Sequence, residues 1–273
     1  MGRLAEFFSR RKKFEPEGHV VSGRLAEFRL MKLTRAVSED ALVLEGIRLP
    51  DPDEGGRREI DMVIATGDEI IFVEQKHWSG SFTITEEGRF LQKRKNGGTL
   101  LHKDIIAWTC RKGELLCKLH ENRTGKSAPP SKVILVFSNK NLEWDSLPPG
   151  VDAEAYDEMG FINMVEKMNK SAPDEDLKET LLGFGTWDTI YMNGGQTIIG
   201  DILDYPFDKK NCSINHTGIL GLITGPKSTL STGQEVTDQS GPLVAVVGED
   251  KSRIIPFANI SKIEFSNPRA DWG

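Results

Sequence analysis

The chain has 273 residues, of which 38% are hydrophobic and 28% charged, and its formal net charge at pH 7 is −6. This composition excludes a chain that is disordered over most of its length. The negative charge disfavours a protein that coats nucleic acid through a basic surface. It is compatible with an enzyme that touches nucleic acid transiently through a bound cation, because the cation supplies positive charge itself. No apolar run approaches the roughly 20 residues that span a bilayer, so we expect no membrane partner.

Residues 1–19 predict a flexible leader. The segment lacks the apolar core and the small-residue cleavage site of a secretory signal. The three cysteines of the chain have no metal-ligand spacing, which is typical of reduced thiols in a protein core. These features predict a cytoplasmic protein, and the basic run Arg10–Lys13 leaves a nuclear location open.

Residues 20–184 predict an α/β domain. An apolar stripe at helical spacing begins near Gly23 and predicts a helix, with Leu25, Phe28, Leu30, Leu33 and Val37 on the stripe. Strands are expected at 41–50, 59–65 and 69–76, and the last two form a hairpin around the turn at 66–68. A second hairpin at 81–91 turns at 86–88. Helical patterns follow at 100–121, 156–170 and 174–183, and the apolar strand 132–138 is of the kind buried at the centre of a sheet. The expected fold is a mixed sheet flanked by helices.

Residues 185–273 have a different texture, with short strands separated by Gly, Asn and Asp turns and no long helical pattern. Strand patterns occur at 187–205, 218–224, 242–250, 252–260 and 262–266. They predict a small all-β barrel domain. Its opening and closing strands weakly resemble an Sm-like or SH3-like barrel, a resemblance that implies a protein partner or self-association.

The hairpin at 59–76 carries the residues with candidate chemistry. Side chains alternate along a strand, so Glu74 and Lys76 point to one side, and Asp61 on the preceding strand can reach the same side. Two carboxylates and an ammonium group are costly to bury on one face of a sheet without a purpose. Mg²⁺, with Mn²⁺ as a substitute, is the natural partner of the carboxylates, and the backbone carbonyl of Gln75 is a third ligand. Lys76 would then orient a metal-bound water or neutralise developing negative charge.

The run EIDMVIATGDEIIFVEQKHWSG at 59–80 resembles the nuclease-related domain (NERD), a branch of the PD-(D/E)xK nuclease superfamily. Asp61, Glu74 and Lys76 fill the motif positions, followed by Trp78 and Gly80 as its aromatic-x-Gly. The resemblance covers about residues 20–140 and implies a restriction-endonuclease-like fold. It also implies that Glu27, in the helical Gly-x-x-x-Glu of Gly23–Glu27, belongs to the site and holds an outer-shell water.

Two positions depart from the family pattern. Gln75 is polar where an apolar residue is expected, and it must find a partner on the opposite side of the sheet. Ile60 replaces the superfamily's proline. Neither change removes a predicted metal ligand.

Basic residues outnumber acidic ones between Arg89 and Lys118 in an otherwise acidic chain. One interpretation is a track for the phosphate backbone of nucleic acid, most pronounced at Lys93, Arg94 and Lys95 in a predicted loop. The other is a solvated hairpin and helix face. His77 and His102 are candidate bases or phosphate contacts, although lone histidines are usually neither.

Three functions from different classes remain open. The first is a Mg²⁺-dependent nuclease that hydrolyses phosphodiester bonds in DNA or RNA, with nucleic acid as a transient partner. The second is a non-catalytic module that binds nucleic acid or protein on a nuclease fold. The third is a structural adaptor that works mainly through the barrel. The first is favoured because every predicted ligand position keeps competent chemistry.

Overall fold

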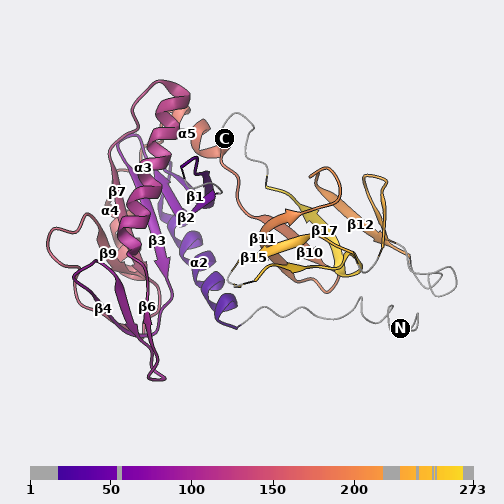
Figure 1. The fold of residues 1–273 in the computed structure, drawn as a ribbon. Helices are drawn as coiled ribbons and strands as arrows, with labels where there is room; N and C mark the ends of the chain where they lie inside the picture. The colour runs from indigo at the N-terminus through magenta and orange to yellow at the C-terminus, as the bar shows by residue number, and fades with distance from the viewer. Residues whose placement is uncertain are drawn as a thin grey trace. The chain divides into compact units, whose positions relative to one another are not determined.

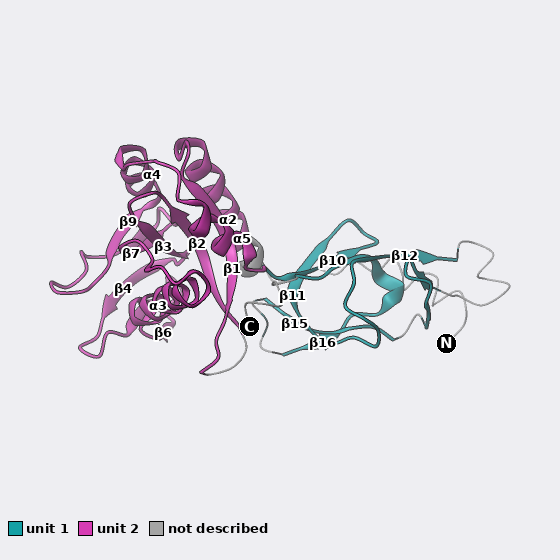
Figure 2. Ribbon diagram, turned by 90° about the horizontal axis from the view of Figure 1, so that it is seen from above, with its two compact units in different colours: residues 1–20, 186–267 teal, residues 21–185, 268–273 magenta. Residues whose placement is uncertain are grey.

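The computed structural model describes residues 18–53, 57–217, 228–237, 240–247, 249 and 251–266. The predicted leader and the strand pattern at 218–224 therefore lie wholly or largely outside the described residues. The chain divides into two compact units between Gly185 and Thr186 (Figure 2). Each unit has its own buried core, so each is considered by itself.

A five-stranded mixed sheet forms the centre of the unit that includes residues 21–185 (unit 2 in Figure 2), in the order β1-β2-β3-β7-β9 (Figure 1). Its strands are β1 (Leu42–Pro50), β2 (Arg57–Ala65), β3 (Ile70–Lys76), β7 (Ser131–Phe137) and β9 (Glu154–Asp157). The first three pair in antiparallel fashion, and β3, β7 and β9 run parallel. The predicted hairpin is thus β2–β3, and the apolar strand at 132–138 is β7, buried between β3 and β9.

Helices cover both faces of this sheet, as Figure 2 shows from above. One face packs against α2 (Gly18–Val37) and α4 (Glu158–Lys167) through apolar residues such as Leu30 and Phe161. The other packs against α3 (Ile105–Thr124) and α5 (Glu175–Gly183). Aspartates cap the N-termini of α3, α4 and α5, which explains where these helices begin. The predicted α/β fold class is confirmed.

The apolar stripe predicted for α2 coincides only in part with the face that packs on the sheet, where Leu30 is buried and Val37 packs against the core. Leu25 is 64% exposed and Phe28 58%, whereas Ala26, Leu30 and Met31 are buried. The helix was predicted correctly, but Leu25 and Phe28 were wrongly expected on its packing face, where Ala26 and Met31 lie instead.

A second, four-stranded sheet lies beside the first in the order β6-β5-β4-β8. It consists of β4 (Gly80–Ile84), β5 (Phe90–Lys93), β6 (Thr99–Leu101) and β8 (Leu142–Glu143). The hairpin predicted at 81–91 is confirmed as β4–β5. Gly80 has φ +89°, and a Cβ there would lie 2.0 Å from the Lys93 carbonyl oxygen, so this hairpin requires glycine at its start.

The unit that includes residues 186–267 (unit 1 in Figure 2) is built on one antiparallel sheet of eight strands, ordered β14-β13-β12-β17-β10-β11-β15-β16. The strands are β10 (Asp188–Met192), β11 (Thr197–Asp204), β12 (Cys212–His216), β13 (Ser228–Leu230), β14 (Glu235–Val236), β15 (Leu243–Val246), β16 (Arg253–Ile254) and β17 (Ile260–Glu264). The sheet curls around an apolar core that includes Ile190, Ile202 and Phe257 (Figure 1). Its helical content among the described residues is the short turn η1 (Phe257–Asn259), as the sequence pattern predicted. In the described part of the chain, no helix is long and apolar enough to cross a membrane.

Candidate active site

Asp61, Glu74 and Lys76 lie together at the carboxyl end of β3. The Lys76 Nζ is 2.7 Å from Glu74 Oε1 and 3.7 Å from Asp61 Oδ2. The backbone N–H of Gln75 donates to Asp61 Oδ2 over 2.8 Å and fixes that carboxylate against the strand. Strand alternation and hairpin pairing thus bring the three predicted side chains to one face of the sheet.

Helix α3 adds two groups that the sequence did not single out. Lys112 Nζ donates to Glu74 Oε2 over 2.6 Å, and the Thr109 hydroxyl donates to the same oxygen over 3.3 Å. The two residues are three apart, so they share the helix face that packs on β3. In the sequence, Lys112 is one of the basic residues between Arg89 and Lys118. The helical spacing of Thr109 and Lys112 was visible, but nothing in the sequence said that this face meets Glu74.

Gly113 allows α3 to approach β3 closely enough for these contacts. A Cβ at this position would lie 2.5 Å from the ring of Phe72, which is fully buried in β3. Glycine costs helix stability, and here that cost is offset by close packing of the helix on the sheet.

Replacing Gly113 with alanine should therefore lower the free energy of unfolding by about 1–3 kcal/mol, because the added methyl overpacks the core. Gly23→Ala is the matched control, since an added Cβ there meets nothing within 4 Å in helix α2. That variant should gain up to about 1 kcal/mol from helix propensity. Urea unfolding of both proteins checks the prediction, and equal effects at the two positions would contradict it.

The charges of the site are strongly coupled. Burial alone would raise the pKa of Glu74, but Lys76 and Lys112 outweigh it and hold that pKa at about 2. Burial also tends to lower the pKa of Lys76, yet Asp61 and Glu74 raise it, so the ammonium stays protonated at neutral pH. The pKa of Asp61 is raised, first by burial and then by the charge of Glu74. A second cation close to Asp61 would relieve this raised pKa.

Glu27 lies on α2 and shares the electrostatic field of the site. The residue as a whole is exposed, but its carboxyl group lies among protein atoms. Burial of that group, followed by the charges of Asp61 and Glu59, raises the pKa of Glu27 to about 7. The position that the family resemblance singled out is therefore brought near Asp61 and Lys76.

Asp61 and Glu74 are the carboxylates at the strand end, and the Gln75 backbone carbonyl is the third donor that we expect beside them. Within the residues that the structure describes, no three His, Cys, Asp or Glu side chains gather to hold a metal ion. Mg²⁺ does not need such a cage, because it keeps several waters and is usually held by one or two carboxylates. Asp61 and Glu74 are paired hard oxygen donors, and the raised pKa of Asp61 indicates a site that favours added positive charge. The chemistry of these donors therefore fits Mg²⁺ or Mn²⁺.

The Gln75 side chain lies on the opposite face of β3 and is buried, with 6% exposure. The partner expected for its amide is not found, because Nε2 has no hydrogen-bond acceptor among the described residues. That expectation was wrong. The neighbouring face of the sheet is filled by aliphatic side chains such as Val73 and Val136, which offer no acceptor.

The two candidate histidines have different surroundings. His77 Nδ1 lies 3.0 Å from the Ser138 hydroxyl on β7's end. His102 stacks on Trp78 with ring centroids 4.0 Å apart, and its Nε2 lies 3.0 Å from Gln92 Oε1. The pKa of His102 is lowered by burial and then by Lys76 and Arg94, so this ring lies within the field of the site. Trp78 also packs edge-on against Phe82 and Phe90, with ring centroids 5.9 and 6.0 Å apart.

The basic residues between Arg89 and Lys118 have different surroundings. Lys93, Arg94 and Lys95 are exposed at the end of β5 and in the turn that follows. Arg94 acts on the same imidazole as Lys76, which places this turn on the side of the candidate site. Elsewhere, Lys112 is part of the site, and Lys103 lies over the Trp108 ring at 5.0 Å.

Comparison with known proteins finds one family: residues 22–138 match the model of the nuclease-related domain. No curated protein sequence matches the chain. Among solved structures, the small subunit (R.BspD6I2) of the heterodimeric restriction endonuclease R.BspD6I is similar with a TM-score of 0.25 and 11% sequence identity. The match covers 66% of this chain and 86% of that chain.

Proposed function

Because residues 22–138 carry a nuclease-related domain, we propose that the protein is a Mg²⁺-dependent nuclease that hydrolyses phosphodiester bonds in DNA or RNA. The observation that carries the proposal is the convergence of Asp61, Glu74 and Lys76 at one strand end, with Nζ–O distances of 2.7 and 3.7 Å. A family match alone does not say whether these side chains lie close together. The distances between them support the proposal because they do.

The residues have separate tasks in this proposal. Asp61, Glu74 and the Gln75 carbonyl hold the cation, which when bound would lower the pKa of a water molecule. Lys76 keeps its proton and stabilises negative charge on the phosphate as the water attacks phosphorus and the P–O bond breaks. Lys112 and Thr109 hold Glu74 in one orientation by binding its Oε2. Glu27 orients a water of the outer shell.

The exposed turn with Lys93, Arg94 and Lys95 contacts phosphates of the bound strand in this account. Replacing all three with glutamate should weaken binding to a similar degree on different sequences and flatten its salt dependence, because fewer counterions are released. The measurement is fluorescence anisotropy with labelled oligonucleotides over a range of salt concentrations, in Ca²⁺ so that cleavage is slow. An unchanged slope in the triple variant would remove these residues from the interface.

Glu27 gives a pH dependence that can be measured without metal. Its folded pKa of about 7 lies above the ordinary value of 4.5, so the unfolded chain releases this proton first as the pH rises. The associated stability is complete below the lower pKa and is lost as the pH rises through about 7. In EDTA, Glu27→Gln should therefore raise the thermal midpoint relative to wild type more at about pH 8 than at about pH 5. Glu121→Gln, an exposed α3 residue, is the control, and a pH-independent difference at Glu27 would refute the assignment.

One observation favours a second function. Both oxygens of Glu74 already bind ammonium groups, at 2.7 Å from Lys76 and 2.6 Å from Lys112. A site neutralised in this way also suits a non-catalytic module that binds nucleic acid or protein on the same fold.

Metal binding separates the two functions. Calorimetric titration with Mn²⁺ should show binding to the wild-type chain and none to Asp61→Asn, which keeps the side-chain shape but loses the charge. Binding that is absent in both proteins would favour the non-catalytic module. Equal binding in both would place the cation elsewhere.

A further inference from the structure

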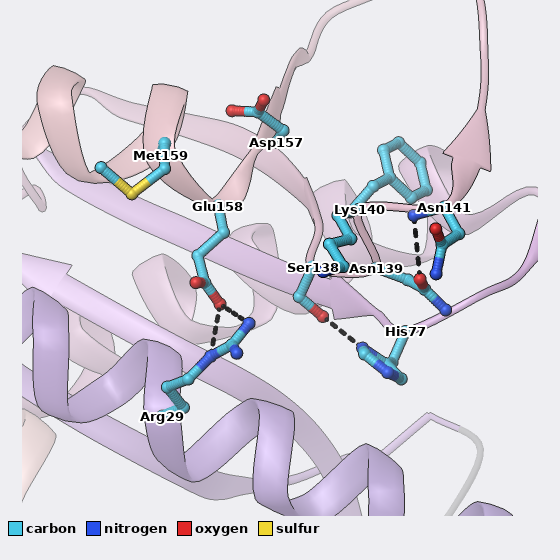
Figure 3. A pocket seen from close by; sticks show the side chains of 10 residues that line it. Arg29, His77, Ser138, Asn139, Lys140, Asn141, Asp157, Glu158 and Met159 are labelled. Carbon is cyan, nitrogen blue, oxygen red and sulfur yellow. Dashed lines mark hydrogen bonds and ion pairs between the residues drawn. The ribbon is translucent and has the colours of Figure 1, made fainter.

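A pocket of about 550 Å³ opens at the carboxyl ends of three parallel strands, β3, β7 and β9 (Figure 3). It is lined from β3 by His77, from the end of β7 by residues 137–141, from α2 by Arg29 and from the start of α4 by residues 157–159. The volume falls within the range of small-ligand sites, roughly 300–1,000 Å³. In open α/β sheets, the carboxyl ends of the strands are where ligands bind.

The charged groups of the pocket are balanced, two basic and two acidic, and Arg29, Glu158 and Asp157 have partners within the protein. Arg29 binds Glu158 Oε2 through Nη2 at 2.6 Å and through Nε at 3.0 Å. Asp157 accepts from the Gly160 backbone N–H over 2.6 Å as the cap of α4. Lys140 is the other basic residue of the lining, and the negative charge of Asp157 balances its positive charge. A phosphate-binding pocket would show a clear excess of positive charge, and this pocket does not.

The neutral side chains of the pocket are of the types that form hydrogen bonds with a nucleobase. His77 and Ser138 are joined over 3.0 Å, and Asn139 Oδ1 accepts the Asn141 backbone N–H over 3.0 Å (Figure 3). The Asn141 side chain is exposed, and its amide has no partner among the described residues. An amide of this kind offers one donor and one acceptor side by side, which suits the edge of a nucleobase.

The pocket adjoins the candidate active site through the chain itself. His77 directly follows Lys76, and alternation sends the two side chains to opposite faces of the strand end. Arg29 follows Glu27 by two residues on α2. A nucleotide with its phosphate at Lys76 therefore has this pocket within reach of its base, on the other side of the end of β3.

We propose that the pocket holds one unpaired nucleobase next to the scissile phosphate, so that the substrate is single-stranded or locally unpaired at the site. The inference rests on the proposed function, because it takes the phosphate to lie at Lys76. A paired base does not fit the proposal, since its hydrogen-bonding edge is occupied by its partner and its faces by stacked neighbours.

Binding of oligonucleotides with a single abasic position tests the pocket without cleavage. The protein is the full chain with Asp61→Asn in EDTA, and the probes are labelled single strands in which the abasic position is moved along the sequence, together with the intact duplex. Removing the base at one position should weaken binding on the order of 10-fold, the usual worth of one well-bound base, while other positions matter little. The duplex should bind more weakly than the single strand.

Asn141→Ala in the same background should erase this position dependence, whereas Asn122→Ala, an exposed asparagine on α3, should keep it. The proposal is overturned if the probes bind alike, if the dependence survives in Asn141→Ala, if the duplex binds as tightly as the single strand, or if no probe binds. Because the readout is binding, a nuclease that cuts but shows no position dependence loses only the base pocket. A protein that shows the dependence but never cuts loses only the catalytic function.

Discussion

Glu74→Ala is expected to abolish cleavage and to lower the free energy of unfolding by roughly 3 kcal/mol. Removing one partner of a buried ion pair costs about 3–5 kcal/mol, because the remaining charge stays buried without compensation. Here Lys112 is left with an 11% exposed side chain. The lower end of the range applies because Lys76, at 24% exposure, can turn toward water. Urea unfolding and a cleavage assay on the same preparation give the two quantities.

A double variant separates stability from catalysis. Glu74→Met with Lys112→Met replaces the buried pair with apolar groups of similar size, which is often neutral or stabilising. It should recover much of the lost stability and none of the cleavage. Recovery of both would show that Glu74 acts only through folding. Lys132→Ala is a surface control, since it removes a partly exposed pair with Glu69 at the other end of β3 and should cost about 1 kcal/mol or less.

Lys76→Ala should reduce the cleavage rate by about 10²–10³-fold and leave metal binding in place, the usual effect of losing one group that stabilises transition-state charge. Glu74 keeps Lys112 as its partner at 2.6 Å, so the carboxylate remains ionised and oriented. The measurement is kcat and KM together with Mn²⁺ affinity. Lys76→Arg should restore part of the rate, because the positive charge returns.

The opposite pattern would count against this role. If Lys76→Ala cuts within a few-fold of wild type, the ammonium does not stabilise the reaction. If metal affinity falls by the same factor as the rate, Lys76 acts by shaping the metal site rather than on the phosphate.

The sequence predicted the parts of the site that depend on local geometry. Alternation along β3 places Glu74 and Lys76 on one face, and the short turn at 66–68 fixes Asp61 beside them. Both follow from the period of a strand and the pairing of a hairpin. Strand geometry does not predict that Glu27 belongs to the site. That prediction followed from the family resemblance alone.

The parts that were missed depend on how helices rotate against the sheet. Thr109 and Lys112 reach Glu74 because Gly113 lets α3 sit close to Phe72, a contact between distant segments that no local pattern encodes. The same limit explains α2, whose buried face is set by the sheet and coincides only in part with its apolar stripe. The pocket at the strand ends could not be predicted from local sequence patterns either, because its walls come from four separate segments.

A comparison of Mg²⁺-dependent cleavage by wild type and by Asp61→Asn shows whether the strand end with Asp61, Glu74 and Lys76 is a catalytic site. Both proteins should be incubated with single- and double-stranded DNA and RNA in Mg²⁺, Mn²⁺, Ca²⁺ or EDTA. Wild type should cleave in Mg²⁺ and Mn²⁺ and only slightly in Ca²⁺, because of the looser geometry of Ca²⁺, and Asp61→Asn should not cleave in any metal. Cleavage that persists in Asp61→Asn or in EDTA, or a wild-type protein that cuts no substrate, would contradict this expectation.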